Sequence, residues 1–183
     1  MKEIRLHGRG GQGAVTSAEL IALSAIRAGR FAQAFPSFGP ERRGAPVMAY
    51  SRVSDSKIRN RSAIYEPDIV VVLDSSLLDS VNVTAGLKDD GLIVLNTHLS
   101  PEEVREKYGF KHRLAVVDAL AIANAILKRP ITNTTMLGAL NRAATIEDNE
   151  QFFACIDERF GKIAAKNKAA FQKAFDTTKI LEA

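Results

Sequence analysis

Residues 4–28 read IRLHGRGGQGAVTSAELIALSAIRA, and this stretch decides the fold. A short apolar strand signal, Ile4–Leu6, leads into the glycine-rich segment Gly8–Gly13, which runs directly into an apolar-rich helical stretch, Ala14–Ala28. Four glycines in six residues cost backbone entropy, so a chain carries them where side chains cannot be accommodated. A strand, a glycine loop and a helix in this order predict the first unit of an α/β fold, with unpaired backbone N–H groups at the helix N-terminus.

The glycine loop admits two interpretations. Its residues Gly10, Gly11, Gln12 and Gly13 can cradle a phosphate or another anion, or the glycines only allow a turn and close packing of the helix on the strand. In the first case the amide of Gln12 can also hydrogen-bond a ligand or a neighbouring chain. Both interpretations remain open at this point.

A dinucleotide site is a weaker alternative for the same loop. The glycine spacing fits G-x-G-x-x-G, but such a site also needs an acidic residue about 20 residues further on, at the end of the second strand. Residues 30–35 read RFAQAF and contain no acid, and Arg30, which could serve a 2′-phosphate, precedes the expected strand. A stand-alone NAD(P)-binding oxidoreductase therefore stays as an alternative only.

A second loop, residues 36–46, has its backbone restricted by prolines and glycines. Because loops at the carboxyl ends of strands share one face in a wound sheet, we expect it to meet the glycine loop. The residues of interest are Pro40, Glu41, Arg42, Arg43 and Gly44. Guanidinium groups here suit the phosphates of coenzyme A or an acidic patch on a partner.

The same region is rich in cations. Residues 41–61 hold six cations against two acids. The cations are Arg42, Arg43, Arg52, Lys57, Arg59 and Arg61. A solvated surface position fits Arg59 and Arg61 best.

Strand and helix signals alternate along the first two thirds of the chain. The predicted strands are Ile4–Leu6, Phe31–Phe35, Val47–Val53, Ile69–Leu73, Leu92–Leu95 and Leu114–Val117. The predicted helices are Ala14–Ala28, Ser76–Gly86, Pro101–Tyr108, Ala119–Leu127, Thr134–Ala144, Asp148–Asp157 and Arg159–Phe175. This order predicts an α/β fold: a doubly wound, mostly parallel sheet with helices on both faces and a helical C-terminal third. Around Val47, after a long loop, an antiparallel pairing is compatible with the pattern.

The last helix carries an apolar stripe, which we assign to the chain's own core in preference to a partner.

Length and composition bound the function. With 183 residues the chain is expected to be a single domain, 1–183. No apolar run is long enough to span a bilayer, and the N-terminus lacks the apolar stretch of a signal peptide, so a cytoplasmic protein without membrane contact is expected. The net charge of +4 does not favour nucleic acid, because the basic residues are not interleaved with aromatics. Cys155, the only cysteine, is expected to be a buried thiol and can hold neither a disulfide nor an iron–sulfur cluster alone.

The sequence offers no catalytic set. His7 ends the first strand and is expected to be a hydrogen-bonded histidine at the core edge, with a ligand contact as the alternative. His98 follows a strand on the expected ligand face, and His112 is expected to be solvated. Asp74 follows the strand Ile69–Leu73 and either caps the next helix or binds a hydroxyl; we favour the cap. No metal-ligand spacing is present.

Three motifs in order, GRGGQGAVTSAELIA at residues 8–22, FPSFGPERRGAPVMAYSRVSD at 35–55 and PDIVVVLDSSLL at 67–78, closely resemble the gamma subunits of 2-oxoacid:ferredoxin oxidoreductases. The resemblance covers nearly the whole chain. Gly44 is followed by Ala45-Pro46, as in the pyruvate-type members. Carried onto this chain, the two loops of the family match Gly10, Gly11, Gln12, Gly13, Glu41, Arg42, Arg43 and Gly44.

The resemblance implies a subunit of a cytoplasmic complex of anaerobic metabolism that converts pyruvate, coenzyme A and oxidised ferredoxin to acetyl-CoA, CO2 and reduced ferredoxin. It implies that thiamine diphosphate and [4Fe-4S] clusters reside on partner subunits, named alpha, beta and delta, and that ferredoxin is reached through the complex. This chain would serve assembly and the face by which coenzyme A enters, and would be inactive alone. A pure subunit-interaction module is the remaining alternative.

Overall fold

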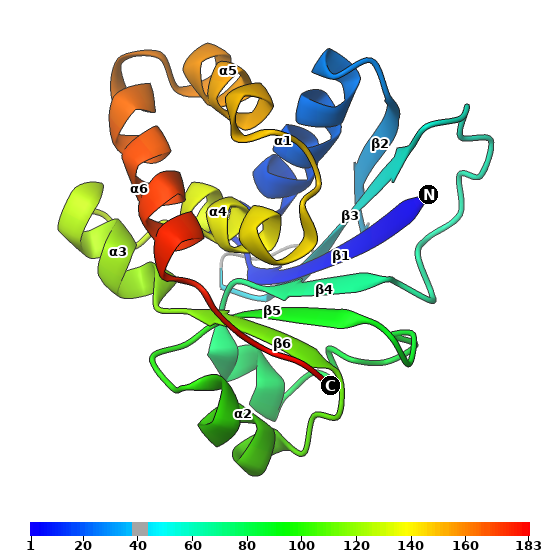
Figure 1. Cartoon of the computed structure of the whole chain (residues 1–183), viewed down its shortest axis with the longest axis vertical. Coiled ribbons are helices and arrows are strands. Elements are labelled where there is room, and N and C mark those ends of the chain that lie inside the picture. The colour runs from blue at the N-terminus through cyan, green and yellow to red at the C-terminus, as the bar shows by residue number, and fades with distance from the viewer. Residues whose placement is uncertain (38–43) are drawn as a thin grey trace.

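The computed structural model describes residues 1–37 and 44–183 of the chain, and these form one mixed sheet flanked by helices (Figure 1). The sheet of the described residues has seven strands in the order β2-β3-β1-β4-β5-β6-β7. They are β1 (Lys2–Arg9), β2 (Phe31–Pro36), β3 (Pro46–Ser54), β4 (Ile69–Val72), β5 (Leu92–Asn96), β6 (Arg113–Val117) and β7 (Lys179–Leu181). The helices are α1 (Ala14–Arg27), α2 (Pro101–Tyr108), α3 (Ala119–Ile126), α4 (Asn133–Ala144), α5 (Asn149–Phe160) and α6 (Ala164–Thr177), with short 3-10 turns η1 (Ser75–Asp79) and η2 (Gly161–Ile163).

The centre of the sheet is parallel. β1, β4, β5 and β6 run side by side in one direction, with Leu6 paired to Val71 and Val71 to Val94. β3 is antiparallel to both β1 and β2, so β2 points the same way as β1. β7 is antiparallel to β6. The mostly parallel α/β sheet is confirmed, as is the antiparallel pairing near Val47.

Alternating side chains divide the core between the two faces of the sheet. Ile4 and Leu6 of β1 join the larger apolar cluster, to which α1, α4, α5 and α6 contribute. Val70 and Val72 of β4 join a second cluster with Val104 of α2. Figure 1 shows the same division, with α2 alone beyond the lower side of the sheet and the other labelled helices above it. The central strands are therefore covered on both faces, as their continuous apolar runs predict.

The predicted helix Ser76–Gly86 is wrong. Only η1 forms, and turns follow it. The guanidinium of Arg5 donates to the carbonyl oxygens of Val83 and Ala85 at 2.9 and 2.6 Å, which holds that segment against the sheet as an irregular loop. The β-branched residues and Asn82 in this stretch also have low helix propensity.

The C-terminal third is helical, as predicted, but its last helix is interrupted. Gly161 adopts a φ of 50°, so α5 ends there and α6 begins only at Ala164. Phe171 and Ala174 of α6 are fully buried in the chain's own core, which confirms the assignment of the apolar stripe, although Ile163 is exposed. The short strand β7 has no counterpart among the predicted elements. None of the described helices is both long and apolar enough to cross a membrane.

Candidate functional site

The glycine loop makes a sharp turn between β1 and α1. Gly11 and Gly13 have φ values of 96° and 83°, a region that side chains other than glycine rarely adopt. A Cβ at Gly13 would also lie 2.7 Å from Nδ2 of Asn133, at the start of α4. These glycines are therefore required by the turn and by the close approach of α4, which supports the packing interpretation and leaves a ligand role untested.

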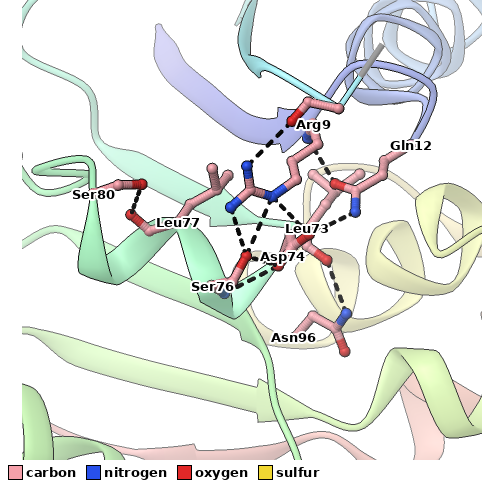
Figure 2. Close-up of polar contacts among 9 residues, drawn as sticks. Arg9, Gln12, Leu73, Asp74, Ser76, Leu77, Ser80 and Asn96 are labelled. Carbon is pink, nitrogen blue, oxygen red and sulfur yellow. Dashed lines mark hydrogen bonds and ion pairs between the residues drawn. The ribbon is translucent and has the colours of Figure 1, made fainter.

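Gln12 closes the loop onto the neighbouring strand (Figure 2). Its Oε1 accepts a hydrogen bond from the backbone N–H of Arg9 at 2.7 Å, and its Nε2 donates to Oδ2 of Asp74 at 2.7 Å. The amide therefore uses one donor and one acceptor within the chain. It ties the loop after β1 to the end of β4, across the centre of the sheet.

Asp74 is the centre of this polar cluster. Its Oδ1 accepts from the backbone N–H and the hydroxyl of Ser76, which makes it the N-cap of η1 and confirms the favoured capping role. Its Oδ2 lies 3.3 Å from Nε of Arg9, and the Arg9 guanidinium also donates to Oγ of Ser76 at 2.8 Å. Burial alone raises the pKa of the Asp74 carboxyl, but the hydrogen bonds from Ser76 and Gln12 and the charge of Arg9 outweigh it and hold the pKa below its usual value.

The second loop returns to the first at Gly44. The backbone N–H of Gly44 donates to the carbonyl of Gly10 at 3.2 Å, and the N–H of Gly10 donates to the carbonyl of Ala45 at 2.9 Å. Arg9 adds a hydrogen bond from Nη1 to the Gly44 carbonyl at 3.2 Å. Gly44 thus lies beside Gly10. The other predicted residues of this loop, Pro40, Glu41, Arg42 and Arg43, lie outside the described residues.

Two cations singled out from the sequence serve the fold. Arg52, counted with the cation-rich segment, is fully buried, pairs with Glu3 at 2.7 Å and stacks over the ring of Phe35. Arg30, considered for a 2′-phosphate, pairs with Asp55 and Glu147, each at 2.7 Å. Arg59 and Arg61 are exposed, as expected.

A polar crevice continues from this cluster along the carboxyl ends of the parallel strands. A cavity of about 160 Å³ is lined by residues from the ends of β4, β5 and β6, among them Asp74, Asn96, His98 and Asp118. Asn96 is committed to the fold, because it donates to the Leu73 carbonyl and accepts from the Ala119 N–H. A second cavity of about 250 Å³ shares Thr97, His98 and Asp118. The sequence analysis did not assign Arg9, Ser76, Asn96 or Asp118 to this site. They could have been found from the polar residues that lie near the end of each parallel strand.

The remaining chemically competent side chains are structural. His7 is buried and accepts a hydrogen bond from Nε of Arg5 at 3.1 Å, which confirms the core-edge interpretation. Burial, reinforced by the charge of Arg5, lowers the pKa of His7 to about 4. Cys155 is buried, as predicted, and burial raises the pKa of its thiol. His112 is half-buried, whereas solvation was expected.

Comparison with known proteins decides the family. The family model described as pyruvate ferredoxin/flavodoxin oxidoreductase matches residues 3–177. The chain belongs to this family. The family model thus confirms the resemblance drawn from the three motifs.

Relatives within the pyruvate ferredoxin/flavodoxin oxidoreductase family match end to end. The chain is 53% identical over 184 residues to the pyruvate/ketoisovalerate oxidoreductases common subunit gamma of Thermococcus kodakarensis, covering 100% of both. It is 48% identical to the pyruvate synthase subunit PorC of Methanothermobacter thermautotrophicus, covering 96% of this chain and 95% of the relative. The crystal structure of pyruvate oxidoreductase subunit PORC from Thermotoga maritima superimposes with a TM-score of 0.89 at 40% identity, covering 99% and 98% of the two chains.

In this member of the family, hydrogen bonds hold the end of the second loop, at Gly44 and Ala45, against the glycine loop. Within residues 1–37 and 44–183 there is no group of three or more histidine, cysteine or acidic side chains that could hold a metal ion. The described part of the rim consists of the glycine loop, the guanidinium of Arg9 and the polar crevice beside them.

Proposed function

We propose that this chain is the gamma subunit of a cytoplasmic pyruvate:ferredoxin oxidoreductase, with residues 1–183 as a single domain. The complex would convert pyruvate and coenzyme A to acetyl-CoA and CO2 and reduce ferredoxin. Full-length similarity to gamma and PorC subunits supports this assignment, and one continuous sheet among the described residues supports one domain. The family match gives no support to a stand-alone NAD(P)-dependent enzyme, and both acids around Arg30 oppose a phosphate there.

In this proposal the chain supplies no redox group. Thiamine diphosphate would be held by the alpha and beta subunits and the [4Fe-4S] clusters by partner chains, with the delta subunit completing the complex. This chain would stabilise the assembly and shape the entrance for coenzyme A. It would act by binding and positioning.

The observation that carries the loop assignment is the pairing of Gly10 with Gly44 and Ala45. Two backbone hydrogen bonds, at 3.2 and 2.9 Å, fix one end of the second loop to the glycine loop, and Gln12 and Arg9 brace that glycine loop against Asp74. We therefore infer that Gly10, Gly11, Gln12, Gly13 and Gly44 form a rigid base. From it Glu41, Arg42 and Arg43 would reach a negative group.

The negative group has two candidates, the phosphates of coenzyme A and an acidic surface of a partner subunit. Guanidinium groups bind either by paired, charge-assisted hydrogen bonds. Coenzyme A is the candidate we choose, because two neighbouring arginines match its several phosphate groups. A partner surface alone is the alternative.

The test is the double variant Arg42→Ala/Arg43→Ala in the complete complex, with Arg59→Ala/Arg61→Ala as the charge-matched control. Loss of charge-assisted hydrogen bonds should raise the KM for coenzyme A about tenfold or more while the KM for pyruvate stays unchanged. Native mass spectrometry reports assembly in the same samples. Unchanged coenzyme A kinetics with weakened assembly would favour the pure interaction module. If neither the kinetics nor the assembly changes, the proposed role of Arg42 and Arg43 is wrong.

A further inference from the structure

Among the residues that the structure describes, no strand lies beyond β2 at the outer edge of the sheet. Among the described residues β2 pairs with β3 alone, and Figure 1 shows it at the margin of the sheet with α1 beside it. Edge strands are normally protected by charged side chains, bulges or covering segments. β2 reads FAQAFP and carries no charge. This edge is therefore suited to accept another strand.

The register shows which groups of β2 point outward. The N–H of Ser37 donates to the carbonyl of Met48, one position beyond the pair Pro36–Ala49. Because main-chain groups in an antiparallel ladder alternate, the N–H and C=O groups of Ala32 and Ala34 face away from β3. The free stretch is bounded at both ends: Pro36 has no N–H, and the N–H of Arg30 donates to the Ala25 carbonyl.

The sequence along this edge reads the same in both directions, Phe31-Ala32-Gln33-Ala34-Phe35. If a second copy pairs antiparallel about a two-fold axis at Gln33, each outward Ala32 meets Ala34 of the other copy. The same register places Phe31 opposite Phe35 and Gln33 opposite Gln33. Isologous contacts of this kind are the commonest in homo-oligomers, and cross-strand aromatic pairs stabilise sheets.

The surroundings of the edge also fit a second copy. Phe31 is 46% exposed, and Leu23 and Ile26 of the adjoining α1 are 47% and 51% exposed. The neighbouring cations are neutralised within the chain, since Arg27 pairs with Glu158 and Arg30 with Asp55 and Glu147. Two copies would therefore bring apolar groups together without charge repulsion.

We propose that β2 is a self-association edge, through which two copies of this chain join their sheets antiparallel about Gln33. In the complete enzyme this contact would connect two sets of subunits. The proposal does not depend on the proposed function, because it uses the edge strand and not the loops.

The register can be tested by cysteine cross-linking of the full chain, alone and within the complex. Gln33→Cys would place two cysteines in a non-hydrogen-bonded pair, with Cα atoms about 4.5 Å apart, which suits a disulfide. Phe31→Cys is the matched control on the same strand, because its two copies would lie about 13 Å apart. The native Cys155 is buried and does not compete. We expect an intermolecular disulfide between two copies for Gln33→Cys only.

A second variant measures the affinity without a cross-link. Gln33→Glu places like charges opposite each other across the two-fold axis of the proposed dimer. The dissociation constant of the dimer in analytical ultracentrifugation should rise about fivefold, with Gln151→Glu on α5 as the control. A monomeric wild-type chain, equal cross-linking of both cysteine variants, or a disulfide to a different subunit would each overturn the proposal.

Discussion

Gln12 illustrates how a residue chosen for a ligand role can be used by the fold. Its amide joins the Arg9 backbone to the Asp74 carboxylate, so the glycine loop is held by side chains of its own chain (Figure 2). Asp74 in turn caps η1 and faces Arg9. Any ligand at this rim would meet a braced loop, which reduces the entropy lost on binding.

His7 gives the sharpest prediction at the residue scale. Its folded-state pKa of about 4 lies below the ordinary value of 6.5, so the unfolded chain binds a proton in this interval that the folded chain does not. The neutral imidazole of His7 therefore contributes fully to the free energy of unfolding above pH 6.5, and this contribution is lost as the pH falls toward 4. Over that range the free energy of unfolding should fall by about 3 kcal/mol through this residue.

The measurement is denaturant unfolding at a series of pH values. The variant His7→Gln keeps an acceptor for Arg5 and removes the titrating group, so its stability should depend less on pH between 6.5 and 4. His98→Gln, at an exposed position, is the control for the exchange of a histidine for a glutamine. Identical slopes for wild type and His7→Gln would contradict the buried neutral imidazole.

At the scale of elements, α4 and α6 can cross closely because residue 138 of α4 is a glycine, which has no side chain. A Cβ at Gly138 would lie 2.1 Å from the carbonyl oxygen of Phe171. The two helices approach this closely while Phe171 packs against Phe152 of α5, with ring centroids 5.3 Å apart. The helical layer over the larger apolar cluster is therefore a tightly packed unit.

Gly138→Ala should destabilise the protein even though alanine favours a helix by about 1 kcal/mol. The methyl group must push α6 away from α4, and overpacking of this kind costs typically about 1–3 kcal/mol. A 2.1 Å approach to a backbone atom places the cost in the upper part of this range, so after the gain in helix propensity we expect a net loss of about 1–2 kcal/mol. The midpoint of urea unfolding measures it, with Glu106→Ala on the exposed side of α2 as the control. A midpoint equal to or above that of the wild type would show that the crossing relaxes at no cost.

At the scale of the whole molecule, the two strand ends that bear the glycine loop and Asp74 are adjacent because β1 and β4 are neighbours in the sheet. About 60 residues separate them in the chain. The chain therefore presents one polar rim, and in the described residues this rim has no metal-binding cluster.

As the proposed gamma subunit, the purified chain should show no pyruvate oxidation by itself. With thiamine diphosphate, coenzyme A and ferredoxin supplied, pyruvate-dependent reduction of ferredoxin should appear only when the partner subunits are added. An assay that follows acetyl-CoA formation provides an independent readout. Turnover by the isolated chain would contradict the assignment as a non-catalytic subunit.

Much of the fold could be predicted because its signals are local. The apolar runs of β4 and β5 and the glycine turn before α1 each lie within a few residues. Ser100 forms a capping box with Glu103, and α2 begins and ends where the pattern predicted. The three motifs were also sufficient to indicate the family.

What could not be predicted involves partners distant in sequence. The segment after Asp79 is irregular because Arg5 binds its carbonyl groups, and β7 exists because β6 offers an edge to three residues near the C-terminus. Arg52, counted from the sequence with the cation-rich segment, is buried against Glu3. Local helix and strand propensities cannot predict such pairings, because these contacts stabilise the protein only after the chain has closed long loops.

The sequence by itself therefore determined the family, the alternation of strands and helices and the position of the sharp glycine turn. Tertiary structure alone decided that Gln12 and Arg9 face Asp74, that Gly44 lies beside Gly10 and that β2 is the outermost strand on its side of the described sheet. The physical reason is the sequence separation over which each interaction acts. Backbone geometry and apolar periodicity act over a few residues, whereas the partner of a polar group is set by which strands become neighbours.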